Sequence, residues 1–329
     1  MNEYKGFLIL QPAFIGDVIL ATSLIESIAD KYPNDPIDFF LRKGNENLLE
    51  NNPHINEIFI WDKKNNKYKN LLKIISNIRK KKYKAVINIH RFFTSGLVTM
   101  LAKSKVKTGY KQNPLSIFYT HKFYFEFREG LHETMRNFRL IEFLGTKYKK
   151  PVLYPSEKDF ETIEPFTKKA YITIAPSSVW VTKQYPPEKW IKAIDNVIDK
   201  NLTVFLLGSK QDISLCQKIK NNCKTSNRIT ILAGKLTFLQ SAALMKKAKM
   251  NYVNDSAPLH ICSAINAPVK AIFCSTTPMF GFYPLSDNSE VIETEEKLSC
   301  KPCGIHGKTK CPEKHFKCAH GISIEKLKI

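Results

Sequence analysis

The chain has 329 residues, of which 43% are hydrophobic and 25% charged, a composition typical of a globular protein large enough for two domains. No stretch approaches the ~18 uncharged apolar residues of a membrane-spanning helix, and we expect no secretory signal at the N-terminus. The net charge of +21 favours an acidic partner: nucleic acid, an anionic membrane face or a phosphorylated substrate. Only seven of the 51 basic residues are Arg, so we expect no nucleic-acid partner. We expect a cytoplasmic protein whose membrane contact, if any, is peripheral.

The chain opens with a strand, a turn and a helix. Residues 6–11 (GFLILQ) form a short, continuously apolar run that predicts a buried strand. An amphipathic helix is predicted from Asp17 to Tyr32, and a second strand over 37–42. Gly16 allows a close backbone approach, and Asp17 has two interpretations. It is either an N-cap, or a functional carboxylate at the end of the first strand, where open parallel sheets hold their sites.

The same alternation continues to residue 144. Strands are predicted over 55–62, 84–90 and 105–110, a strand or a loop over 121–127, and helices over 68–81, after Gly96 and over 131–144. The last of these helices carries His132, Glu133, Arg136 and Arg139 at spacings of three and four. Such spacing places them largely on one face, which is either simply solvated or, together with Arg91, lines a cleft for an anionic substrate.

Residues 145–168 contain three prolines and predict a linker, with a domain boundary near residue 155. The alternation then restarts, with strands over 170–176, 202–208 and 229–234 and helices over 188–200, 212–221 and 237–249. A polar loop containing Thr182 and Lys183 follows the first of these strands. We therefore predict an α/β fold of two doubly wound, Rossmann-like domains facing across a cleft.

The most informative stretch is 249–276, which predicts a strand, a turn, a helix and a strand. Asn254-Asp255-Ser256 have N-cap chemistry, and the helix ends before Pro268. Free backbone amides near 256–258 would point at an anion, framed by Asp255 and His260. The alternative is an ordinary capped crossover helix.

Together, three polar sites suit a nucleotide diphosphate: Gly16-Asp17, Thr182-Lys183 and Asp255-Ser256-Ala257 with His260. The Lys183 ammonium and the helix amides can neutralise a pyrophosphate without a metal ion. Asp17 can take a proton from an acceptor hydroxyl as that hydroxyl attacks. The residues thus predict group transfer from an activated diphosphate, without naming the group.

The cysteines form two groups. Cys216, Cys223, Cys262 and Cys274 occur in helix- or strand-like contexts and are predicted to be small buried hydrophobic residues. Cys300, Cys303, Cys311 and Cys318 lie within nineteen residues, interleaved with His306 and His315. These four thiols either close a structural zinc site or remain reduced or redox-labile, since a cytoplasmic location disfavours disulfides.

Three segments resemble glycosyltransferase family 9, the ADP-heptose:lipopolysaccharide heptosyltransferases: FLILQPAFIGDVILATSLIESI, IAPSSVWVTKQYPPEKW and VNDSAPLHICSAINAPVKAIF. The resemblance covers most of the chain. It implies a GT-B fold and an inverting transfer of heptose from ADP-heptose to the inner core of a lipopolysaccharide precursor of the Kdo–lipid A type. It also implies that no metal cofactor is required, and that the enzyme works peripherally at the inner face of the inner membrane, an anionic surface. The domains would be 1–155 for the acceptor and 156–299 for the donor, followed by a cysteine-rich tail, 300–329.

The resemblance also assigns roles to residues. Asp17 matches the family's general base and Lys183 its donor-phosphate lysine, and Gly16 and Thr182 lie beside them in sequence. Asp255, Ser256, Ala257 and His260 match the donor-binding loop, although the family's usual loop has Gly where this chain has Ala257. Arg91, Lys111, Arg136 and Arg139 are candidate acceptor contacts that no motif assigns. The alternatives are a GT-B enzyme using another nucleotide sugar, and a non-enzymatic basic protein that binds nucleotides or membranes.

Overall fold

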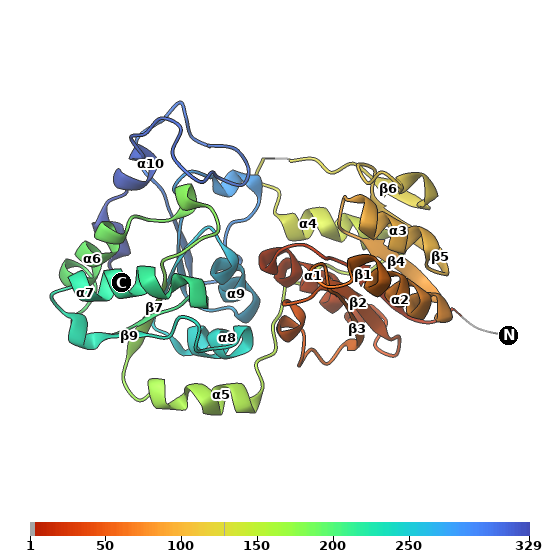
Figure 1. Ribbon diagram of the computed structural model, residues 1–329, viewed down its shortest axis with the longest axis horizontal. Helices are drawn as coiled ribbons and strands as arrows, with labels where there is room; N and C mark the ends of the chain where they lie inside the picture. The colour runs from red at the N-terminus through yellow and green to blue at the C-terminus, as the bar shows by residue number, and fades with distance from the viewer. Residues whose placement is uncertain (1–3, 128) are drawn as a thin grey trace. The chain divides into compact units, whose positions relative to one another are not determined.

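The computed structural model describes residues 4–127 and 129–329, and the chain divides into two compact units, residues 1–154 and 155–329 (Figure 1). Within the described residues, each unit holds one six-stranded sheet whose paired strands all run parallel. Among the helices of these residues, none has the length and apolar character needed to cross a membrane. The predicted cleft between the domains stays a prediction.

The first unit has its strands in the order β3-β2-β1-β4-β5-β6. The strands are β1 (Phe7–Leu10), β2 (Ile37–Arg42), β3 (Ile55–Trp61), β4 (Tyr83–Asn88), β5 (Ser104–Tyr110) and β6 (His121–Phe123). The helices are α1 (Ile15–Lys31), α2 (Lys67–Lys80), α3 (Phe93–Leu101) and α4 (Glu133–Phe138). Side chains of α2 and α3 cover one sheet face, packing on Leu8, Leu10 and Phe40. Because β1 and β2 are central and buried, their sequences are almost continuously apolar.

The second unit has the order β12-β11-β10-β7-β8-β9. Its strands are β7 (Tyr171–Ala175), β8 (Thr203–Leu206), β9 (Ile229–Ile231), β10 (Asn251–Asn254), β11 (Val269–Ile272) and β12 (Ser289–Ile292). Its helices are α5 (Glu157–Ile163), α6 (Pro187–Asn196), α7 (Ile213–Asn222), α8 (Phe238–Lys247), α9 (Ala257–Ile265) and α10 (Lys317–His320). Figure 1 shows α6 and α7 beside each other, and α8 beside α9.

The two sheets have the same topology. Counting strands along the chain within each unit, both follow the order 3-2-1-4-5-6. In such a doubly wound sheet the direction of winding reverses between the first and fourth strands, and ligands bind beyond the carboxyl ends of the strands there. We call this place the switch point: it lies between β1 and β4 in the first unit and between β7 and β10 in the second. The predicted α/β, doubly wound fold class is confirmed.

The end of the cysteine-rich tail is part of the second unit's core. Ala319, Ile322 and Leu327 are fully buried in the same cluster as Trp190. The Tyr252 hydroxyl donates a 2.6 Å hydrogen bond to the Leu327 carbonyl. The tail therefore contributes to the stability of the unit that contains Lys183 and Asp255.

Two sequence predictions of local structure need correction. The proline-containing stretch 145–168 is not only linker, because α5 forms within it on a capping box: Asp159 N donates to Ser156 Oγ (3.3 Å) and Ser156 N donates to Asp159 Oδ2 (2.8 Å). The helix predicted over 131–144 is α-helical only in α4 and continues as a 3₁₀-helix over Arg139–Leu144. The edge strand β12 was missed, since three of its four residues are exposed and leave little apolar signal.

Candidate active site

At the switch point of the first unit stands Asp17. Helix α1 begins at Ile15, so Asp17 is its third residue and not the N-cap. The cap is Phe14, whose side chain cannot accept a hydrogen bond, and Phe14 N donates to Asp17 Oδ2 at 3.0 Å instead. Asp17 thus caps the helix from inside its first turn, next to Gly16. Its half-buried carboxylate stays at the carboxyl end of β1, where chemistry is expected.

A buried ion pair on α4 interacts electrostatically with Asp17. Arg136 Nη2 lies 2.7 Å from Glu133 Oε2, with exposed side-chain fractions of 3% and 9%. Burial raises the pKa of Glu133, the neighbouring Arg136 opposes that rise, and the charge of Asp17 adds to it. Of the two interpretations of this helix, the solvated face is wrong, since His132 and Glu133 are buried as well. The sequence placed Glu133 on this helix face without giving it a role of its own, although its spacing of three from Arg136 was the available signal.

The candidate acceptor residues fall into two groups. Arg91 follows β4, and its guanidinium lies 3.9 Å from the centroid of the Phe125 ring; Arg136 approaches the same ring at 5.6 Å. The charges of Arg91, Arg136 and Arg139 all act on the buried hydroxyl of Tyr110. Lys111 is instead hydrogen-bonded to the Tyr124 hydroxyl and lies 4.5 Å from that ring's centroid. The structure therefore brings the three arginines toward one region of the unit.

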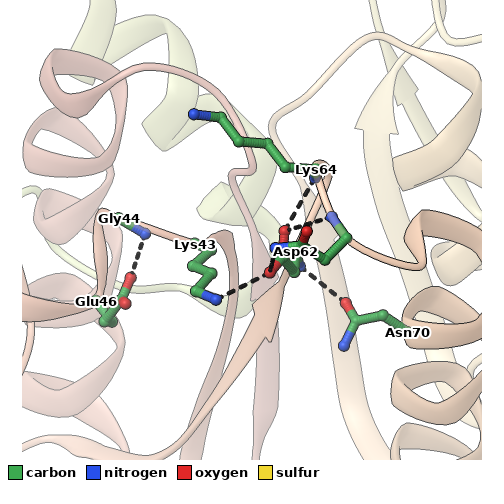
Figure 2. A network of polar contacts seen from close by, with 7 residues as sticks. Lys43, Gly44, Glu46, Asp62, Lys64 and Asn70 are labelled. Atoms are coloured by element: carbon green, nitrogen blue, oxygen red, sulfur yellow. Dashed lines mark hydrogen bonds and ion pairs between the residues drawn. The ribbon is translucent and has the colours of Figure 1, made fainter.

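The loop after β3 supports the segment that precedes α1. Figure 2 shows Lys43, the Lys64 backbone and Asn70 converging on Asp62, with Lys43 Nζ at 2.9 Å from Asp62 Oδ2. The hydrogen bond from Lys43 is the main reason why the pKa of Asp62 is well below its usual range. The neighbouring Lys63 donates to the Pro12 carbonyl at 3.0 Å. This network fixes the loop that leads into Asp17.

At the switch point of the second unit, Lys183 pairs with Asp255. Lys183 ends a 3₁₀ turn (Val181–Lys183) that follows β7, and Asp255 follows β10. Lys183 Nζ lies 2.7 Å from Asp255 Oδ2, with exposed side-chain fractions of 14% and 8%. Thr276 donates a further 2.6 Å hydrogen bond to the same oxygen. The topology thus brings together two residues that are 72 positions apart in sequence.

Helix α9 begins beside this pair. Its N-cap is Ser256, with extended backbone and no side-chain capping bond. Pro258 has no N–H, so the anion site predicted from amides near 256–258 is reduced to the amides of Ser256 and Ala257. Ala257 begins the helix and is not among the residues with positive φ in the described chain. Alanine at this position, where the family has Gly, is therefore not strained by a left-handed backbone conformation.

His260 is buried and neutral one turn into α9. Burial, with a smaller contribution from the charge of Lys183, lowers its pKa to about 3. Within the described residues its Nδ1 atom has no hydrogen-bond partner. Buried polar atoms are nearly always satisfied, so this solvent-inaccessible ring nitrogen is an exception among the described residues.

Asn254 is a positioning residue, which the sequence predicted only as part of an N-cap stretch. Its Nδ2 donates to the Pro176 carbonyl (2.8 Å), and Tyr185 N donates to its Oδ1 (2.9 Å). One fully buried side chain thereby ties both ends of the Lys183 loop to β10. The available signal was an amide residue directly after a buried apolar strand.

Thr182 does not share the environment of Lys183. It is 2% exposed, and its hydroxyl oxygen accepts hydrogen bonds from Lys308 N (2.7 Å) and Ser275 Oγ (3.0 Å). Its role as a donor contact stays a prediction.

The four tail cysteines line one cavity of about 310 Å³, together with His315 and Thr182. Cys300 Sγ lies 4.0 Å from His315 Nε2, and burial raises the pKa of Cys318 to about 11. Among the residues that the structure describes, however, no three His, Cys, Asp or Glu side chains form a group that could hold a metal ion. Zinc stays a prediction, which elemental analysis of the purified protein decides. The other four cysteines are buried, as predicted.

Comparison with known proteins gives consistent results. The family model "Glycosyltransferase family 9 (heptosyltransferase)" matches residues 71–315. The chain is 28% identical to lipopolysaccharide heptosyltransferase 3 of Escherichia coli K12 over 290 residues, covering 83% of each chain. Escherichia coli ADP-heptose LPS heptosyltransferase II aligns with a TM-score of 0.78 and 21% identity, covering 91% of this chain and 95% of that one. Escherichia coli heptosyltransferase WaaC with ADP aligns with a TM-score of 0.72 and 19% identity, covering 87% of this chain and 92% of that one. Because the family model spans most of the chain, this protein belongs to glycosyltransferase family 9, a family of heptosyltransferases.

Proposed function

We propose that this enzyme transfers a heptose from ADP-heptose to the inner core of a lipopolysaccharide precursor. Family membership favours an enzyme over a mere binding protein. One relative is named as a lipopolysaccharide heptosyltransferase, and one similar structure contains ADP. The observation that carries the proposal is the second unit's switch point, where a mostly buried lysine ammonium lies beside a helix N-terminus.

The donor diphosphate binds at that switch point. Lys183 is held 2.7 Å from Asp255, and this ion pair orients its ammonium at the switch point. The amides of Ser256 and Ala257, at the positive end of α9, provide the remaining donors. Charge-assisted hydrogen bonds from these groups stabilise the negative charge that develops on ADP as it leaves, without a metal ion.

The acceptor reacts by a single in-line displacement. Asp17 takes the proton of the acceptor hydroxyl, and the oxygen bonds to the anomeric carbon of the sugar. The bond from that carbon to the phosphate oxygen breaks on the opposite face, so ADP leaves and the configuration inverts. General-base assistance of this kind accelerates a reaction by about 10²- to 10⁴-fold. Arg91 and Arg136 supply positive charge for an anionic acceptor.

The direct test is release of ADP from ADP-heptose in the presence of a Kdo-bearing lipid A acceptor. We expect release that depends on the acceptor and that is faster than with any other nucleotide sugar offered at equal concentration. Acceptor-dependent release from a different nucleotide sugar alone would keep the GT-B mechanism and replace the donor. Failure to bind ADP would contradict the proposed donor site itself.

The enzyme also works against an anionic membrane surface. Support comes from the net charge of +21 and from exposed aromatic residues that follow strands of the first unit: Phe14, Phe92 and Phe93 are 62%, 67% and 56% exposed. Arg42 lies 4.9 Å from the centroid of the Phe14 ring. The protein should co-sediment with vesicles that contain phosphatidylglycerol at low salt and should dissociate from them at high salt. Equal binding to uncharged vesicles would contradict an electrostatic attachment.

A further inference from the structure

The cysteine-rich tail covers the turn that carries Lys183. Thr182 N donates to the Lys308 carbonyl at 3.1 Å, and Lys308 N donates to Thr182 Oγ1 at 2.7 Å. These reciprocal bonds join the tail to the residue directly before Lys183. Ser275, in the loop after β11, donates a second hydrogen bond to the same hydroxyl oxygen. The hydroxyl of Thr182 is therefore hydrogen-bonded within the protein.

Gly307 lies against the Lys183 side chain itself. A Cβ atom at this position would lie 3.1 Å from Lys183 Cγ, 3.1 Å from Thr182 Oγ1 and 3.3 Å from Trp180 Cβ. Such contacts are tight, so a side chain here would displace the lysine stem or the turn. Gly304 has a similar backbone, with φ of +82° against +77°, yet its added Cβ would meet nothing within 4 Å. Gly304 therefore serves as a control for Gly307, because alanine at either position introduces similar backbone strain and only alanine at 307 meets close neighbours.

The covering segment is anchored on both sides. Before it, Cys303 N donates to the Ser275 carbonyl at 2.7 Å, and Lys301 Nζ donates to the Phe273 carbonyl at 3.0 Å. After it, Ala319 and Ile322 are buried in the core of the second unit. The loop after β11 also links the turn that carries Lys183 to Asp255, since Ser275 bonds to Thr182 and the next residue, Thr276, bonds to Asp255.

We propose that residues 305–308, here named the tail clasp, position the Lys183 ammonium for the donor diphosphate. A free lysine has four rotatable bonds, and ordering them on binding costs affinity. The clasp fixes the turn through Thr182 and limits the lysine stem through Gly307, so this cost is met when the protein folds. Thr182 and Gly307 are positioning residues, acting through Lys183. This inference rests on the proposed role of Lys183 in donor binding.

The test compares ADP affinities by titration calorimetry. We expect Gly307→Ala to weaken ADP binding about tenfold, the effect of one displaced charged hydrogen bond, and Gly304→Ala to change it less than about twofold. Both variants introduce alanine at positive φ, so backbone strain is matched. Equal effects of the two substitutions would overturn the clasp. Thr182→Val should weaken ADP binding similarly, whereas Thr182→Ser, which keeps the hydroxyl, should restore it; this pair decides the matter if Gly307→Ala does not fold.

A double-mutant cycle separates positioning from general loosening of the unit. In a Lys183→Ala background, Gly307→Ala should change ADP affinity by less than about twofold, because the group that it displaces is gone. A tenfold loss in both backgrounds would refute action through Lys183 and leave the proposed donor site intact. If Lys183→Ala alone leaves ADP affinity unchanged, the proposed donor site fails, and the clasp with it.

Discussion

The two units share one topology and place different chemistry at the same point of it. In both, the strand order reverses between the first and fourth strands, and polar residues follow those two strands. The first unit has Asp17 and Arg91 there, with exposed aromatic residues around them. The second has the Lys183–Asp255 pair and a buried, neutral His260. The fold determines where ligands bind, and the side chains determine which ligands.

The helix N-termini at the two switch points show the difference clearly. In α1 the first turn contains its own carboxylate, Asp17, which accepts from a terminal backbone amide. In α9 the first turn has no acidic residue, and the Ser256 side chain makes no capping bond. A helix N-terminus that carries its own anion does not need one from a ligand, whereas an uncapped one does. This difference supports the proposal that proton transfer belongs to the first unit and diphosphate binding to the second.

The largest expected effect is that of Asp17→Asn. The amide keeps an oxygen that can accept from Phe14 N, so the helix cap survives while the base is lost. Turnover should fall by about 10²- to 10⁴-fold, with ADP affinity unchanged. Steady-state kinetics and calorimetry measure the two quantities. Asp30→Asn, on the exposed other end of α1, is the control and should leave turnover within about twofold. Weakened ADP binding with intact turnover would reverse the assignment of the two units.

Lys183→Ala should produce the complementary result. Removing the ammonium takes a charge-assisted hydrogen bond from the diphosphate and leaves Asp255 buried without its cation. ADP affinity should fall by about ten- to a hundredfold, while the KM for the acceptor stays the same. Lys192→Ala, an exposed lysine on α6, is the matched control. A change confined to the acceptor KM would show that this unit does not bind the donor.

Sequence alone predicted the architecture because its signals are local. The apolar run 37–42 predicted a strand and the amphipathic stretch 68–81 predicted a helix, and the observed bounds of β2 and α2 agree with these predictions to within a residue or two. The association of Lys183 with Asp255 was also foreseeable, since carboxyl ends of adjacent parallel strands meet at one edge. The order of the sheets, which makes β7 and β10 neighbours, came from the structure.

What sequence could not provide are contacts between distant segments. The bond of Thr182 to Lys308 joins residues 126 positions apart and leaves no periodic signal in either segment. The burial of Glu133 and Arg136 was missed for the same reason, because charges at a spacing of three usually indicate a solvated helix face. Such contacts depend on which elements pack together, which in turn depends on the whole fold.

The pH dependence of stability tests a property that the two units share, a buried histidine with a lowered pKa. His260 has a pKa of about 3 in the folded chain against 6.5 ordinarily, so the unfolded chain binds a proton more readily. Stability should therefore be unaffected above pH 6.5, fall as the pH drops below it, and stop falling from this cause below pH 3. Between pH 7 and 5 the loss is about 2 kcal/mol. Urea unfolding of His260→Gln should show a smaller loss over this interval, with His90, whose pKa is lowered to about 4 mainly by burial, contributing what remains from the first unit. An identical pH profile in the variant would contradict a buried, neutral His260.

The smallest expected effect is on the acceptor side. Arg91 is exposed, and its guanidinium carbon lies 3.9 Å from the centroid of the Phe125 ring, so an aromatic ring supports a charge that a ligand can reach. Arg91→Ala should raise the acceptor KM about three- to tenfold without changing ADP affinity, because one solvent-exposed ion pair with a ligand contributes little. The control is Arg79→Ala. Arg79 lies in the last turn of α2, shortly before β4 begins, whereas Arg91 follows the end of β4. If Arg91→Ala weakens ADP binding instead, the first unit also binds the donor, and the two switch points do not bind separate substrates.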